Sequence, residues 1–272
     1  MIRPEFVSDA IEQSPDESLV GHYGPFLLKS AFQPILDISG TSRKIIGYEG
    51  LIRPHLDGAI VSPAVFFPAI DEEDRFFIEW LCRALHLRNF NLFRRPGQQV
   101  FINLDPGSYI DLARSIREVS IMIERMATVG LTPADMVCEI VESRAASNHV
   151  LWRLARCFQE AGVTIAVDDF GAQWSDDRRI AAIRPDIVKL DRTWFKAHLG
   201  DPALEQKARA VIDRFAESGI RIVAEGIETE LELDFARACE IPMAQGFYLG
   251  RPQLSDSWPC PARAPGNELV FG

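Results

Sequence analysis

Two adjacent carboxylates, Asp168 and Asp169, follow the short apolar run from Ile165 to Val167 and precede Gly171. Neighbouring residues of a strand point to opposite faces of a sheet. The two aspartates can therefore reach one site only where the strand gives way to a loop, and Gly171 allows the backbone to turn there. Such a pair could hold a metal ion beside a phosphate, whereas this motif by itself is also typical of a solvated turn.

Polar side chains follow several other apolar runs along the chain, which argues against a chance cluster. They are Glu49, Asn103, Glu139 with Glu142 three residues later, Lys189 with Asp191, Glu225 and Gln245. Carboxylate and amide oxygens suit Mg²⁺ or Mn²⁺ rather than zinc. Neither the five histidines nor the five cysteines have a metal-binding spacing, and the cysteines are typical of reduced core residues.

This set of polar side chains predicts one class of reaction. Two divalent cations, about 4 Å apart, would neutralise the crowded carboxylates and generate a hydroxide aimed at a phosphate. Lys189 could hold that nucleophile or stabilise phosphate oxygens, and Arg53 could bind a phosphate. The predicted reaction is metal-assisted hydrolysis of a phosphodiester.

The elements that carry these residues alternate between strands and helices. The first strand is expected at Phe32 to Ile38, and each later strand is expected to end at a polar residue named above. Amphipathic helical segments are expected at Asp74 to Asn89, Ile110 to Met126, Leu151 to Ala161, Leu204 to Glu217 and Leu231 to Glu240. About eight such repeats predict an α/β fold of the (β/α)8 TIM-barrel type, in which the carboxyl ends of the strands carry the chemistry. An open doubly wound sheet is disfavoured because no glycine-rich phosphate loop follows an early strand.

Length and charge agree with a single enzyme-sized barrel. The chain has 272 residues and a net charge of -10, which disfavours a nucleic-acid polymer as partner. No apolar stretch is long enough for a membrane segment, and the first residues lack the apolar core of a signal peptide, so we expect a cytoplasmic location. We expect an N-terminal extension at 1–30, a barrel at 31–255 and a tail at 256–272. The extension is too short for a sensory domain, which suggests a stand-alone protein or a piece of a longer one.

A set of motifs occurs in a fixed order along the chain. They are Phe32-Gln33-Pro34-Ile35, Glu49-Gly50-Leu51-Ile52-Arg53, Ile102-Asn103-Leu104, Glu139-Ile140-Val141-Glu142, Asp168-Asp169-Phe170-Gly171, Lys189-Leu190-Asp191, Ala224-Glu225-Gly226-Ile227-Glu228-Thr229, and Gln245-Gly246-Phe247-Tyr248 through Arg251-Pro252. This series resembles the EAL domain family of cyclic di-GMP phosphodiesterases from about Ala31 to Pro252. The resemblance implies a barrel whose first strand is antiparallel to the others, and hydrolysis of cyclic di-GMP to linear pGpG.

The resemblance also implies roles for individual residues. The first metal ion would be held by Glu49, Asn103, Glu139 and Asp168. Asp168 would bridge to a second ion held by Asp169 and, directly or through water, by Glu225. Mg²⁺ or Mn²⁺ would support the reaction, whereas Ca²⁺ would inhibit it.

Further roles implied by the resemblance concern water, substrate and a loop. Lys189 would contact the nucleophilic water, and Gln245 would position solvent near the metal ions. Arg53 and Leu51 would touch the dinucleotide, with Gln33 and Pro252 on the guanine side. Glu142 would anchor the loop after Asp169, and the family habit implies a homodimer.

The chain departs from the family pattern at two places. Gly50 replaces the usual alanine, which leaves Glu49 in place. After Gly171 the family usually continues Thr-Gly-Tyr-Ser-Ser, whereas this chain reads Ala172-Gln173-Trp174-Ser175-Asp176. That loop connects the dimer interface with metal binding in the family, so the change bears on rate and regulation without touching a metal ligand.

Three functions remain open at this point. The first is an active cyclic di-GMP phosphodiesterase. The second is a catalytically weak receptor that senses cyclic di-GMP, and the third is another metal-dependent barrel, such as an enolase-type enzyme with Lys189 as proton abstractor. A protein kinase, suggested by Asp169-Phe170-Gly171, is excluded because its glycine-rich loop and His-Arg-Asp element are missing.

Overall fold

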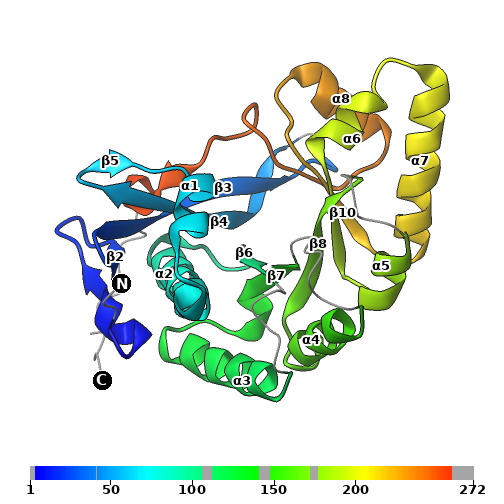
Figure 1. Ribbon diagram of the computed structural model, residues 1–272. Helices are drawn as coiled ribbons and strands as arrows, with labels where there is room; N and C mark the ends of the chain where they lie inside the picture. Colours follow the sequence, from blue (N-terminus) through cyan, green and yellow to red (C-terminus); the bar gives the residue numbers. More distant parts are fainter. Residues whose placement is uncertain (1–3, 41, 106–111, 141–147, 172–176, 259–272) are drawn as a thin grey trace. The chain divides into compact units, whose positions relative to one another are not determined.

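The structure is a computed structural model that describes residues 4–40, 42–105, 112–140, 148–171 and 177–258 (Figure 1). The chain divides into two compact units. One, the barrel unit, comprises Phe32–Leu51 and Gln99–Pro252. The other, the smaller unit, comprises Met1–Ala31, Ile52–Gln98 and Gln253–Gly272.

The barrel unit contains a closed barrel of eight strands surrounded by helices. Its strands are β3 (Phe26–Asp37) and β4 (Lys44–Leu56), which both extend into the smaller unit, followed by β6 (Gln99–Leu104), β7 (Met136–Ile140), β8 (Thr164–Phe170), β9 (Ile187–Leu190), β10 (Arg221–Ala224) and β11 (Met243–Ala244). Its helices are α3 (Leu112–Thr128), α4 (Asn148–Glu160), α5 (Asp177–Ile183), α6 (Arg192–Ala197), α7 (Pro202–Glu217) and α8 (Glu230–Ala238). The predicted (β/α)8 class is therefore confirmed.

The strand order around the barrel is β3-β11-β10-β9-β8-β7-β6-β4, and β4 pairs back with β3 to close it. The pairs from β4 through β11 are parallel, as βαβ crossovers require. β3 runs antiparallel to β11, with Met243 opposite Asp37 and Ala244 opposite Leu36. This confirms the expectation that the first strand is antiparallel.

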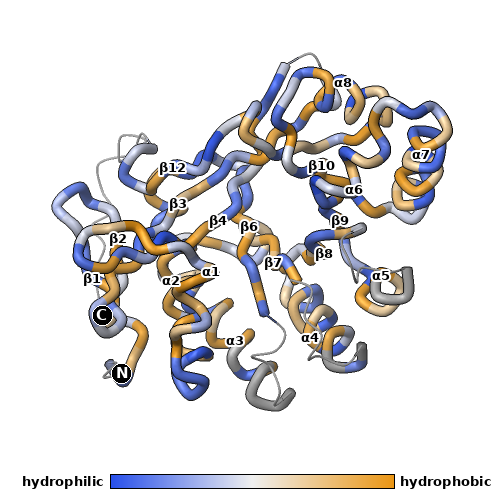
Figure 2. Tube along the Cα trace, turned by 45° about the horizontal axis from the view of Figure 1, so that its top comes forward, coloured by the Kyte–Doolittle hydropathy of each residue, from blue (hydrophilic) through white to orange (hydrophobic). Residues whose placement is uncertain are grey.

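One apolar layer fills the inside of the barrel. It takes one buried residue from each of seven strands, namely Ile35, Phe101, Val137, Ala166, Ile187, Val223 and Met243, and Ile46 of β4 packs against them. The outer helices cover the barrel with one face each. On α7 the buried residues are Ala208, Ile212 and Phe215, and apolar and polar residues alternate along this helix in Figure 2.

Two strand ends differ from those expected from the sequence. β4 does not end at Glu49 but continues to Leu56, where it forms a hairpin with β5 (Ala59–Ile60). β8 does not give way before the aspartate pair but runs through it to Phe170. Both extensions are possible because residues beyond the polar positions still find a neighbouring strand: His55 pairs with Ile60, and Phe170 pairs with Leu190.

The smaller unit has its own core. β1 (Ile11–Gln13), β2 (Leu19–Tyr23) and the start of β3 form an antiparallel sheet. The unit also contains α1 (Pro63–Phe66), α2 (Arg75–Phe93) and β12 (Gln253–Leu254). Within this core the buried Tyr23 hydroxyl donates a hydrogen bond to Asp74 at 2.8 Å. Among the described residues, no helix has the length and apolar character needed to cross a membrane.

Candidate functional site

Six of the candidate residues lie one strand period beyond the apolar layer. Each of six candidates follows a layer residue by two positions: Asn103 follows Phe101, Glu139 follows Val137, Asp168 follows Ala166, Lys189 follows Ile187, Glu225 follows Val223 and Gln245 follows Met243. Because side chains alternate with a period of two, these residues share the inward face at the carboxyl ends of the strands. β3 runs the opposite way, so Gln33 precedes Ile35 by two positions and reaches the same level.

Glu49 joins this group because a glycine precedes it on the inner face of β4. A Cβ atom at Gly47 would lie 2.5 Å from the Gln99 carbonyl oxygen and 3.0 Å from the Phe101 ring. The Phe101 side chain therefore uses the space that a side chain at position 47 would need. Glu49, two residues later, projects at the level of the other polar residues.

The centre of the site is the ammonium group of Lys189. Its side chain is only 1% exposed, yet Nζ lies 2.7 Å from Glu225 Oε1, 2.8 Å from Glu139 Oε1 and 3.1 Å from Asp168 Oδ1. Glu49 Oε2 is somewhat farther, at 3.7 Å. Carboxylates from four different strands thus converge on one buried cation.

Two amides complete the environment of Glu49. Asn103 Nδ2 donates to Glu49 Oε1 at 3.2 Å, and Gln245 Nε2 donates to Glu49 Oε2 at 2.7 Å. Both donor groups face the carboxylate, which leaves the two amide oxygens as further potential ligands. Gln245 Oε1 is buried and has no hydrogen-bond partner among the described residues.

Burial and the crowding of charge shift the pKa values of these groups. Burial is the main reason that the pKa of Glu139 is raised well above its ordinary value, and the charges of Glu49 and Asp168 add to it against the opposing effect of Lys189. Burial likewise raises the pKa of Glu225. For Lys189, burial alone would lower the pKa, but the neighbouring carboxylates outweigh it and hold the pKa well above its ordinary value.

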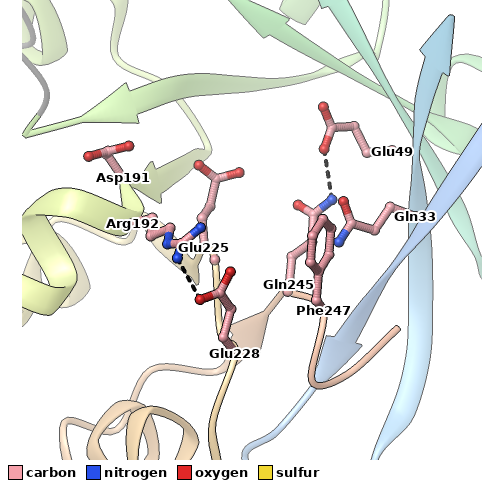
Figure 3. Close-up of a pocket in the computed structure, with 10 residues that line it drawn as sticks. Gln33, Glu49, Asp191, Arg192, Glu225, Glu228, Gln245 and Phe247 are labelled. Carbon is pink, nitrogen blue, oxygen red and sulfur yellow. Dashed lines mark hydrogen bonds and ion pairs between the residues drawn. The ribbon is translucent and has the colours of Figure 1, made fainter. Parts of the chain in front are cut away.

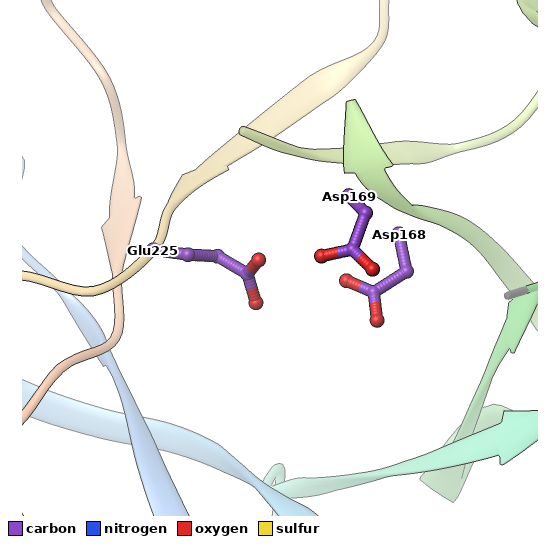
Figure 4. A group of neighbouring side chains, drawn as sticks. All are labelled: Asp168, Asp169 and Glu225. Carbon is purple, nitrogen blue, oxygen red and sulfur yellow. The ribbon is translucent and has the colours of Figure 1, made fainter. Parts of the chain in front are cut away.

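Asp168 and Asp169 reach the same site through a local break in β8. The pairing of β8 with β9 shifts register between Val167 and Phe170, and Asp169 has a φ of 56°. This left-handed conformation is uncommon for a residue other than glycine. It turns a side chain that would otherwise face outward, and oxygens of Asp168, Asp169 and Glu225 lie within 4.8 Å of one another (Figure 4). The predicted convergence is present, but a bulge within the strand produces it rather than the start of a loop.

The donor set fits a hard divalent cation. It consists of carboxylate and amide oxygens, which Mg²⁺, Mn²⁺ and Ca²⁺ prefer. Within the described part of the chain, Glu139 Oε2 is buried without a hydrogen bond, whereas Glu139 Oε1 and Asp168 Oδ1 face the Lys189 ammonium group. Their nearest positive charge is Lys189, so one ammonium group faces several carboxylates. A cation would neutralise this excess of negative charge.

A cavity of about 210 Å³ opens beside the carboxylates. Its lining includes Gln33 on β3, Glu49 on β4, and Glu225 and Gln245, which directly follow β10 and β11 (Figure 3). Gln33 Nε2 donates to the Gly250 carbonyl at 3.1 Å. The cavity is thus continuous with the predicted site.

Residues at the start of α6, between β10 and α8, and after β11 form another wall of the same cavity. They are Asp191, Arg192, Gly226, Glu228, Gly246 and Phe247. Arg192 forms an ion pair with Glu228, and Lys196 also pairs with Glu228, at 3.0 Å. The stem of Arg192 lies over Gly226, where a Cβ atom would meet it at 2.5 Å. Neither Arg192 nor Phe247 carries a local sequence signal for a site residue, although Phe247 directly follows the Gln245-Gly246 pair.

The remaining predicted residues have different positions. Leu51 lies on β4 two residues after Glu49, and Pro252 is the last residue of the barrel unit. Arg53 lies on the part of β4 that belongs to the smaller unit, where its Nη1 donates to the Ile52 carbonyl at 2.9 Å. Glu142 and the segment from Ala172 to Asp176 lie outside the described residues. The substrate and loop roles of all these residues stay predictions.

Comparison with known proteins adds an independent observation. The EAL domain family matches residues 27–252. "Probable cyclic di-GMP phosphodiesterase PdeD" of Escherichia coli is 28% identical over 247 residues, which are 86% of this chain and 45% of the relative. "Cyclic di-GMP phosphodiesterase PA2567" of Pseudomonas aeruginosa is 27% identical, with 83% of this chain and 38% of the relative covered. The chain thus spans less than half the length of either of these relatives.

Solved structures resemble the chain as well. The calcium and cyclic di-GMP complex of Klebsiella pneumoniae BlrP1 matches with a TM-score of 0.73 and 27% identity, over 84% of this chain and 56% of that one. A manganese and cyclic di-GMP complex of BlrP1 matches with a TM-score of 0.74 and 26% identity, over 90% of this chain and 59% of that one. Both neighbours contain a divalent metal ion together with the dinucleotide.

Proposed function

The chain belongs to the EAL domain family, and on that basis we propose that it is a metal-dependent phosphodiesterase that hydrolyses cyclic di-GMP to linear pGpG. The observation that carries this proposal is the convergence of Asp168, Asp169 and Glu225 within 4.8 Å of one another, beside the buried Lys189. Relatives named as cyclic di-GMP phosphodiesterases favour this reaction over an enolase-type proton abstraction.

The residues divide into groups with separate tasks. Glu49, Asn103, Glu139 and Asp168 would hold one cation, while Asp168, Asp169 and Glu225 would hold a second. A divalent cation, when bound, supplies Lewis-acid activation of water and neutralises charge on a phosphate.

Two further residues would act directly on the reacting groups. Lys189 would donate a hydrogen bond to the attacking water or a phosphate oxygen, and its carboxylate neighbours keep the ammonium group in place. Gln245 is held by its bond to Glu49 and would orient solvent at the cavity. We assign the metal as Mg²⁺ or Mn²⁺, because these ions prefer compact coordination by oxygen ligands.

Gln33, which lines the cavity, would contact the substrate. Gln33 donates one N–H to Gly250, which leaves its amide oxygen as an acceptor for a guanine edge. Leu51, Arg53 and Pro252 are proposed as further contacts with the dinucleotide. The cytoplasmic location and the homodimer remain proposals, and sedimentation of the purified chain would test the second.

A turnover assay tests the proposal. The chain is incubated with cyclic di-GMP and Mg²⁺ or Mn²⁺, and chromatography separates the substrate from pGpG. Glu49→Gln should abolish product formation with an unchanged melting temperature. The control Glu160→Gln should behave like the parent, because Glu160 is exposed and forms an exposed ion pair with Arg156 on α4. Full turnover by Glu49→Gln would refute the assignment of the site.

A second candidate function is a cyclic di-GMP receptor. The departure from the family pattern at Ala172-Gln173-Trp174 favours it, because the metal ligands are retained while the following loop differs. Tight binding of cyclic di-GMP in Ca²⁺, together with no turnover in Mg²⁺ or Mn²⁺, would replace the enzyme proposal with the receptor proposal.

A further inference from the structure

The indole of Trp194, on α6, lies directly against the backbone of Gly171. A Cβ atom at Gly171 would be 2.4 Å from both Cγ and Cδ1 of Trp194 and 2.7 Å from its Cβ. Gly171 also has a φ of 92°, which favours glycine. Position 171 is therefore a glycine for two reasons, and one of them is the close approach of this tryptophan.

Phe170, the residue between Asp169 and Gly171, is held from two sides. Its ring packs edge-on against Trp194 at 6.3 Å and against Phe215 of α7 at 5.0 Å, measured between ring centroids. Its carbonyl accepts a hydrogen bond from the Asp191 backbone at 3.0 Å. The chain is thus fixed immediately after Asp169.

The start of α6 is fixed in turn by Asp191. This side chain accepts hydrogen bonds from the backbone N–H groups of Thr193, at 2.8 Å, and Trp194, at 3.3 Å. Asp191 therefore links the end of β9 to the turn that presents the indole. The His198 ring, one turn later, packs against the Trp194 indole, with ring centroids 4.3 Å apart.

The backbone conformation of Asp169 depends on its neighbours. Its left-handed backbone is a conformation that persists only where the surroundings hold it. On the N-terminal side of Asp169, the shift in strand register begins after Val167. On its C-terminal side, Phe170 and Gly171 both lie against Trp194.

We propose that Trp194 is a positioning residue that holds the β8 bulge and thereby keeps Asp169 turned towards Asp168 and Glu225. This inference rests on the proposed function, because it assigns Trp194 an effect on the metal ion that Asp169 would hold. Trp194 does not touch that ion. It acts through Phe170 and Gly171, as residues around metal ligands commonly do.

The test measures Mn²⁺ binding to the whole chain by electron paramagnetic resonance, which reports free Mn²⁺. Trp194→Ala should weaken Mn²⁺ affinity at the site that includes Asp169 about 10- to 100-fold, the range typical for the loss of a residue that orients a ligand. Trp194→Phe should retain most of the affinity because a ring still covers Gly171. The melting temperature of each variant is recorded beside its affinity.

Phe195→Ala provides the matched control on the same helix. Phe195 is buried and packs on Phe235 of α8, with ring centroids 5.1 Å apart, rather than on the bulge. Its truncation should lower the melting temperature and leave Mn²⁺ affinity unchanged. If Trp194→Ala does not fold, Trp194→Leu replaces it, with an Mn²⁺ affinity expected to be about 10-fold weaker than that of the parent.

The possible outcomes separate this inference from the function on which it rests. A parent chain that binds no Mn²⁺ would overturn the proposed function and this inference with it. A parent chain that binds Mn²⁺ while Trp194→Ala or Trp194→Leu binds it equally well would overturn only the role of Trp194. A loss of affinity in Phe195→Ala equal to that in Trp194→Ala would show a general effect of stability, which also overturns it.

Discussion

Replacing Lys189 by methionine should destabilise the metal-free chain more than most substitutions. The change keeps a long side chain in place but removes the ammonium group, whose nitrogen lies within 3.1 Å of Glu139, Asp168 and Glu225. Breaking a buried ion pair by removing one partner typically costs about 3 to 5 kcal/mol, because the other charge stays buried. Since domains are stable by only about 5 to 15 kcal/mol, the loss should be easy to measure.

A divalent cation should restore much of this loss. Without the ammonium group to repel it, Mn²⁺ should bind Lys189→Met more tightly than the parent, and in excess Mn²⁺ each tenfold difference in affinity narrows the gap by about 1.4 kcal/mol. The assay is urea unfolding of the parent and of Lys189→Met, each in EDTA and in Mn²⁺. The gap in free energy of unfolding between the two chains should be wide in EDTA and narrower in Mn²⁺.

Arg83→Met is the control, because Arg83 is another buried cation but lies in the smaller unit. Its side chain is 4% exposed, with Glu79 at 3.8 Å and Trp80 beneath its guanidinium group. Its loss of stability should not depend on Mn²⁺. Equal unfolding midpoints for Lys189→Met and the parent in EDTA, or a gap that Mn²⁺ leaves unchanged, would refute the reasoning.

Three other outcomes are expected. Ca²⁺ should support binding of cyclic di-GMP but not its cleavage, because calcium coordination is longer and more flexible; calorimetry and product chromatography would check this, and equal rates in Ca²⁺ and Mg²⁺ would contradict it. Burial, with the charges of Arg53 and Arg83, lowers the pKa of His86 to about 3. The contribution of neutral His86 to the free energy of unfolding should therefore be complete above about pH 6.5, the ordinary pKa of histidine. It should fall by about 1.4 kcal/mol per pH unit as the pH drops towards 3. His86→Gln should show a shallower fall in urea unfolding over that range, and a slope equal to that of the parent would count against it. Restoring Thr-Gly-Tyr at Ala172-Gln173-Trp174 should raise kcat several-fold, since a lost hydrogen bond is worth on the order of 1 kcal/mol. Steady-state kinetics would measure this change, and an unchanged kcat would exclude an effect of the loop on rate.

The sequence allowed the barrel and its polar ring to be predicted because both follow from short periodic patterns. An apolar residue two positions before a polar one, as in Val137 and Glu139, places both on the inner face of a strand. This rule needs no knowledge of distant contacts. It also holds for Gln33 once β3 is taken as antiparallel.

Features that depend on tertiary contacts could not be predicted from the sequence. The bulge at Asp169 needs the pairing of Phe170 with Leu190 and the packing of Trp194, which no local pattern contains. The polar residue Glu49 predicts a strand end at that position. In the structure, the hairpin with β5 extends β4 beyond it to Leu56. Arg192 lines the cavity only because α6 begins there.

The hydrogen bond from Gln245 to Glu49 joins residues 196 positions apart. Glu49 leaves the ribosome long before its partner, which directly follows β11, the last strand of the barrel. A nascent chain can therefore bring Lys189 together with Glu139, Asp168 and Glu225 before Gln245 is available to bind Glu49. Capture of metal and substrate by the full set of ligands becomes a late event in biosynthesis, which delays any chemistry until the barrel has nearly emerged.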